Sequence, residues 1–282
     1  MERTAPKLLE WLYPTMVVIC GGWLAWHAPA FILDFFPPER AGDLARITAL
    51  HETKQVATGL GGLFTPFTDI MDWIALIALP IFVVLGTINV RRYSMEYEHF
   101  TVFDRLAMFI GRVVMVLIIV LTCVMLYEVA LRYIFNKPTL WANELTLWLA
   151  GFVFIMSGMY TMQQRAHIRI TMLYDNAGRW IRRCFDVLST VLFVGFTYFL
   201  IYGSYKQIMV NKFQKWEMFG TAFDPPIPAT IQPMILIMMT LLALQMVANL
   251  IADWNKDPEV YGTGTDIDEE EIELMRKTLG EK

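Results

Sequence analysis

The sequence predicts an all-α integral membrane protein with about six transmembrane helices and both termini in the cytoplasm. Hydrophobic residues make up 56% of the 282-residue chain and charged residues only 18%, and the mean hydropathy is +0.45. Six apolar runs approach the ~20 residues that a helix needs to cross a bilayer. Because backbone amides in lipid must be hydrogen-bonded within the protein, runs of this length and number predict a helical bundle and not strands.

The six apolar runs differ in how clearly they predict a membrane span. They cover roughly residues 12–34, 73–90, 106–130, 143–163, 184–208 and 229–251. The first run has a small-residue stretch at its end that resembles a signal-peptide cleavage site, but Glu10 and the length of the run favour an uncleaved anchor. The second run is short and contains Pro80, which can kink a helix. The third run is the clearest.

The distribution of basic residues sets the predicted orientation. With the N-terminus inside, the two short inner loops hold Arg91, Arg92, Arg105, Arg165, Arg169, Arg179, Arg182 and Arg183. Such a concentration in short loops is typical of the cytoplasmic side. Residues 253–282, with ten acidic and four basic residues, then form a cytoplasmic tail. This composition favours a solvated, partly disordered tail over a short amphipathic helix around Met275.

Residues that could carry chemistry are few. The chain has no Walker A loop, nucleophile elbow, zinc-protease motif or dinucleotide fingerprint, and no basic surface suited to nucleic acid, so it is not predicted to be an enzyme or a nucleic-acid binder. Only His27 lies within an apolar run, whereas a membrane haem needs paired histidines. Cys20, Cys123 and Cys184 lack paired spacing and are predicted to be small buried hydrophobic residues. We expect no cofactor and no metal ion in this chain.

The stretch RYIFNKPTLWANEL, residues 132–145, interrupts the apolar sequence with charges and aromatic rings. Glu128 and Arg132 are four residues apart, so on one helix they share a face and can pair. Glu144 opens the next helix, where a carboxylate suits the positive end of the dipole. These residues predict a rigid outer corner closed by a Glu128, Arg132 and Glu144 cluster, although an ordinary interfacial belt with its charges in water stays an equal alternative. The aromatic residues that suit the headgroup level are Tyr133, Phe135 and Trp141.

This stretch and the segment after it resemble the small membrane subunit of tripartite ATP-independent periplasmic (TRAP) transporters, the DctQ-like family. The likeness covers roughly residues 104–252, which hold four of the apolar runs. The matching positions are Arg132, Tyr133, Pro138, Trp141, Glu144, Gly158, Arg165, His167 and Ile168. Thr171 stands where the family usually has Asp, so this chain lacks that carboxylate.

The resemblance implies three regions. Residues 1–100 form an N-terminal extension with two transmembrane helices and a long periplasmic loop, residues 101–252 form a four-helix small-permease core, and residues 253–282 form the acidic tail. The extension carries no motif. Inert membrane anchoring, a larger scaffold, lipid binding and a periplasmic contact surface all stay open for it.

The resemblance also implies a function. In such systems a periplasmic substrate-binding protein delivers an organic acid, such as a C4-dicarboxylate, to a complex in the bacterial inner membrane. A large permease subunit there carries the substrate and Na+ sites. This chain would be the fixed small subunit, in contact with the large permease, the binding protein and membrane lipid, and would itself bind neither substrate nor Na+. Arg165, His167 and Arg169 would lie at a cytoplasmic interface.

Two other classes of function stay open from the sequence. A membrane-anchor subunit of a redox enzyme complex would give a b-type absorption band in the purified chain. A self-sufficient channel or transporter would transport substrate alone in proteoliposomes. Against the second class, Pro80 and Pro233 do not occupy corresponding positions in two halves, as the broken helices of a transport pathway usually do.

Overall fold

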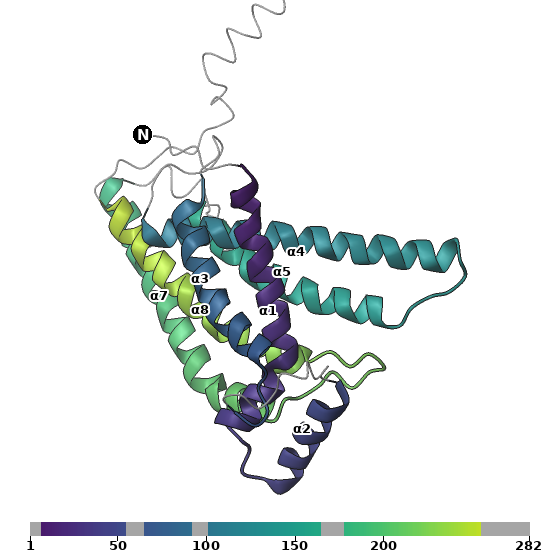
Figure 1. Cartoon of the computed structure of the whole chain (residues 1–282). Coiled ribbons are helices and arrows are strands. Elements are labelled where there is room, and N and C mark those ends of the chain that lie inside the picture. The colour runs from purple at the N-terminus through teal and green to yellow at the C-terminus, as the bar shows by residue number, and fades with distance from the viewer. Residues whose placement is uncertain (1–6, 55–64, 92–100, 165–177, 255–282) are drawn as a thin grey trace, which may run out of the picture.

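The computed structural model describes residues 7–54, 65–91, 101–164 and 178–254, and these residues are helical and contain no β-strand (Figure 1). The helices in chain order are α1 (Lys7–Phe35), α2 (Ala41–Lys54), α3 (Ile70–Asn89), α4 (Val102–Tyr133), α5 (Trp141–Gln163), α7 (Arg179–Tyr205), η1 (Lys206–Gln214) and α8 (Ile227–Asp253). The η1 segment is π-helical and continues α7 without a break. The predicted all-α class is therefore confirmed.

Six helical segments of the described residues are long and apolar enough to cross a bilayer. They are Glu10–Phe35, Ile70–Asn89, Val102–Tyr133, Trp141–Gln163, Trp180–Gln214 and Ile227–Asp253. Each contains or closely overlaps one of the six predicted runs, so the number and order of the spans are confirmed. Most of the helices extend beyond the apolar run because polar residues form their first turns. The cytoplasmic placement of the termini stays a prediction.

Helix α2 is an element that the apolar runs did not predict. It lies between the first two spans, and its buried Ile47 packs against Ile32 and Leu33 of α1 and against Trp216 and Ala229 of the C-terminal half. Asp43 lies in its first turn, where an acid is favourable. The spacing of Leu44 and Ile47 was the available signal, but a polar helix outside the membrane leaves no hydropathy peak.

The helices form a bundle from which one hairpin projects. In Figure 1, α1 lies beside α3, and α7 lies beside α8, while α5 packs against both α4 and α8. The first half of α4 is buried beneath α1 and α3. Its second half and the start of α5 extend away from the other helices, and we call residues 118–147 the α4–α5 arm.

Two of the three cysteines differ from their prediction. Cys123 and Cys184 are exposed and Cys20 is partly exposed, so burial within this chain was wrong for Cys123 and Cys184. An apolar residue on a membrane helix can face lipid as readily as protein, and hydropathy does not separate the two environments. All three cysteines are free thiols.

Candidate functional site: the corner between α4 and α5

A tight turn connects α4 to α5. The helix continues its bonding past Tyr133, with the Ile134 amide donating to the Ala130 carbonyl at 2.9 Å. Asn136 then adopts a left-handed conformation with φ of 51°, which Asn tolerates better than most side chains. The Lys137 amide donates back to the Leu131 carbonyl at 2.9 Å. These bonds end α4 and direct the chain toward Pro138 and α5.

Glu128 is the buried centre of this corner, with 2% of its surface exposed. Its carboxylate accepts from Arg132 Nη2 at 2.8 Å and from Arg132 Nε at 3.2 Å, so the predicted pairing along one helix face is confirmed. It also accepts from the Thr139 amide at 3.0 Å and from the Thr139 hydroxyl. Glu128 therefore fastens the end of α4 to the turn. The part played by Thr139 was not predicted.

Glu144 does not join this pair. Its Oε2 atom accepts from Thr221 Oγ1 at 2.6 Å and from the Asp224 amide at 3.1 Å, both in the loop before α8. The predicted cluster of Glu128, Arg132 and Glu144 was therefore wrong in its third member. Glu128 already supplies the carboxylate for Arg132, and Glu144 instead bonds to a loop some 80 residues later in the sequence.

The loop that Glu144 holds has two residues with unusual backbone conformations. Trp216 and Asp224 have φ values of 47° and 57°, which are uncommon for residues with a side chain. Asp224 Oδ1 accepts from the Gly220 amide at 2.7 Å, so the carboxylate closes the loop on itself. Buried Trp216 packs into the cluster around Ile47. The surrounding contacts maintain these conformations.

The aromatic residues of the corner lie largely on its outside. Tyr133 and Phe135 are exposed, and the rings of Tyr127 and Trp141 lie 6.0 Å apart. The Arg132 side chain is 44% exposed even though its partner is buried. The corner thus combines features of both hypotheses, because a buried carboxylate closes it while its rings and half of its cation face outward.

A chain of aromatic rings connects the corner helix to the N-terminal extension, and the sequence did not predict it. The Trp148 indole of α5 donates to Thr230 Oγ1 of α8 at 2.8 Å. The Trp26 ring of α1 lies 6.2 Å from the Trp148 ring and 5.8 Å from the Phe223 ring. These contacts hold α1, α5, α8 and the preceding loop together.

A second polar cluster holds the opposite ends of the core helices together. Asp104 in the first turn of α4 accepts from Gln245 Nε2 of α8 at 2.7 Å. The same amide donates to Asn249 Oδ1 at 2.9 Å, and Asn249 Nδ2 donates to the Met162 carbonyl of α5 at 3.0 Å. Asp104 and Gln245 are fully buried. The candidate residues Arg165, His167 and Arg169, which follow α5, lie outside the described residues.

His27 is held by a carboxylate rather than by a second histidine. Its Nδ1 atom lies 3.2 Å from Asp72 Oδ1, and the Trp23 indole donates to the same oxygen at 2.8 Å. Asp72 Oδ2 accepts from the Asp69 amide at the start of α3. The group therefore fixes α1 against α3. Within the described part of the chain, no three His, Cys, Asp or Glu side chains come together as metal ligands would.

The family comparison identifies the region that contains this corner. Residues 121–256 match the family described as tripartite ATP-independent periplasmic transporters, DctQ component. No curated protein and no solved structure gives a match. The matched region begins within α4, includes Glu128, Arg132 and Glu144, and ends just beyond α8. Over these residues the chain is therefore similar to the DctQ component of such transporters.

Proposed function

We propose that this chain is the small permease subunit that supports a large permease subunit in Na+-coupled uptake of an organic acid. A periplasmic binding protein delivers that acid, which is a C4-dicarboxylate or a related carboxylate. The complex lies in a bacterial inner membrane, with both termini of this chain in the cytoplasm. The match of residues 121–256 to the DctQ component is the observation that carries this proposal.

The α4–α5 arm supports a role as a docking element for the large subunit. The arm lies within the matched region from residue 121 onward, and the bundle leaves the outer faces of its two helices uncovered. Large apolar side chains cover these faces, including Ile119, Leu126, Val129 and Leu147. Helices in a membrane associate by close packing of such faces, so the arm suits another polytopic protein.

The buried carboxylates support the view that the chain itself has no substrate or Na+ site. Asp72, Asp104 and Glu128 each accept hydrogen bonds from groups of this chain, and each bond joins helices or closes a turn. Ionisable groups at membrane depth commonly mark ion pathways, but these three form structural connections. In this proposal the large permease carries substrate and Na+.

Co-purification with the large permease tests the docking surface. Leu126 on the arm and Leu192 on α7 are both 63% exposed, which makes them matched positions. We expect Leu126→Trp to lower the fraction of large permease recovered after gentle detergent extraction, because the larger ring prevents close helix packing. Leu192→Trp should leave it unchanged. Equal recovery of the large permease with both variants would show that the arm is not part of the interface. If the unmodified chain formed no stable complex, the subunit role would be contradicted.

A further inference from the structure

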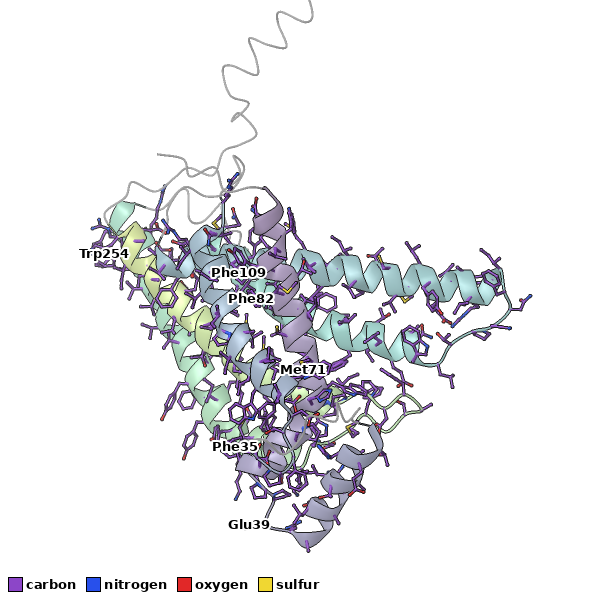
Figure 2. All side chains as sticks on the ribbon, viewed as in Figure 1. Phe35, Glu39, Met71, Phe82, Phe109 and Trp254 are labelled. Carbon is purple, nitrogen blue, oxygen red and sulfur yellow. The ribbon has the colours of Figure 1, made fainter. Side chains whose placement is uncertain are left out.

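The N-terminal extension covers one half of α4. Buried side chains from residues 107–117 of α4 include Phe109, Val113 and Leu117, which pack against Tyr13, Val17 and Val18 of α1 and Val83 of α3. Figure 2 places Phe109 where these helices cross. From residue 118 onward α4 is mainly exposed. The covered half precedes the start of the family match at residue 121, so the extension packs on the part of α4 that is not matched.

A buried cation lies in this covered half. Arg112 is 3% exposed, and its Nε atom lies 4.0 Å from Oε1 of Glu10 in α1, whose side chain is also buried. Arg112 Nη2 donates to the Arg91 carbonyl just after α3, at 3.4 Å. A charged side chain within a membrane span is costly unless it has partners. The extension therefore supplies both a counter-charge and a carbonyl to Arg112.

The shape of α3 is also fitted to α4. Gly86 is buried, and a β-carbon at this position would overlap the Phe109 ring. Phe109 is itself buried among residues of three helices and has little room to move. At the other end of α1, Trp26 lies against Trp148 of α5, so the extension also contacts the matched residues 121–256.

We propose that residues 7–54 and 65–91 act together as a built-in two-span subunit of the core. Glu10 neutralises Arg112, Gly86 admits the Phe109 ring, and together they close the covered half of α4. The core therefore requires the extension for its stability, and a partner protein has access only to the remaining surfaces, such as the α4–α5 arm. An inert membrane anchor would carry none of these requirements.

The counter-charge is tested by thermal unfolding of the full chain in detergent. We expect Glu10→Gln to lower the unfolding temperature by roughly 5 °C, since buried Arg112 loses the negative charge that α1 supplies. Glu39→Gln is the matched control, because Glu39 is an exposed acid of the same extension, at the opposite end of α1 (Figure 2). The double variant Glu10→Arg with Arg112→Glu should recover part of the loss. Equal midpoints for Glu10→Gln and Glu39→Gln would overturn the proposal.

The steric fit gives an independent test if Glu10 variants fail to accumulate. Gly86→Ala should lower the unfolding temperature, whereas Gly22→Ala in α1 should not, because nothing lies within 4 Å of the added carbon at Gly22. The double variant Gly86→Ala with Phe109→Leu should lower the unfolding temperature by less than the sum of the decreases in the two single variants. Equal effects of the two glycine variants would contradict the proposal. These measurements use the isolated chain, so their outcome is separate from that of the transport function.

Discussion

Arg132 bonds Glu128, one turn earlier on α4, at 2.8 Å, and leaves Glu144 to the loop before α8. Both members of the ion pair therefore belong to a single helix end. An i,i+4 pair with a half-exposed cation stabilises weakly by itself. The stronger connection is the one from the buried Glu128 carboxylate to Thr139, because it joins the helix to the turn that follows.

The first prediction concerns Glu128. Glu128→Ala removes the acceptor for the Thr139 amide and hydroxyl, so we expect the turn between α4 and α5 to loosen. Thermal unfolding in detergent should show a lower midpoint than for Arg132→Ala, because Arg132 is half exposed and its loss leaves the bonds to Thr139 in place. An Arg132→Ala variant as unstable as Glu128→Ala would mean that the ion pair dominates the corner.

The second prediction concerns Glu144. Glu144→Ala should cost about 1 kcal/mol of unfolding free energy, since the Thr221 hydroxyl and the Asp224 amide lose an acceptor. Exchanging charges, with Arg132→Glu and Glu144→Arg together, should bring no recovery, because the two residues bond to different partners. A double-mutant cycle between Glu144→Ala and Thr221→Val measures the coupling. Recovery of stability in the charge-exchanged variant would instead support the predicted cluster of Glu128, Arg132 and Glu144.

The third prediction concerns Gln245. Gln245→Leu leaves Asp104 Oδ1 without its donor in a fully buried site, and the expected loss is about 1–3 kcal/mol. Gln207→Leu is the control, because Gln207 is exposed on η1. Both changes replace the same side chain and remove a side-chain hydrogen bond, because Gln207 Oε1 accepts from Asn211 Nδ2 at 2.7 Å, so denaturant unfolding compares a buried bond with an exposed one. Equal losses would show that the bond from α8 to α4 contributes little.

The fourth prediction concerns orientation. In a chain freed of Cys20, Cys123 and Cys184, a new cysteine at Asp268 should react with an impermeant thiol reagent only after the inner membrane is opened. The concentration of arginine in short loops predicts a cytoplasmic tail. A second cysteine, at exposed Glu39, should react in intact spheroplasts. If Glu39 were protected and Asp268 reacted in intact spheroplasts, the chain would have the opposite orientation.

The spans could be predicted from sequence because a bilayer imposes a length and a polarity on each helix. The Glu128–Arg132 pair could be predicted for a similar reason, since four residues of one helix bring two side chains together. Both are local consequences of helix geometry. The apolar pattern and the spacing contain this information without knowledge of the fold.

The partners that sequence reasoning missed are distant in the chain. Glu144 bonds to Asp224, Gln245 to Asp104 and Trp26 to Trp148, and no local pattern specifies these contacts. The exposure of Cys123 was missed for a different reason. In a membrane protein both lipid and the protein interior are apolar surroundings, so composition does not predict which of the two an apolar residue faces.

The length of α4 has a mechanical consequence. At 1.5 Å per residue, its 32 residues span about 48 Å, whereas the hydrocarbon core is about 30 Å thick. The helix must therefore lean or extend beyond the lipid. The half up to residue 117 is clamped by α1 and α3, and the following 16 residues extend as a rigid lever of about 24 Å. A tilt of roughly 5° at the clamp displaces the tip, with Glu128 and Arg132, by about 2 Å.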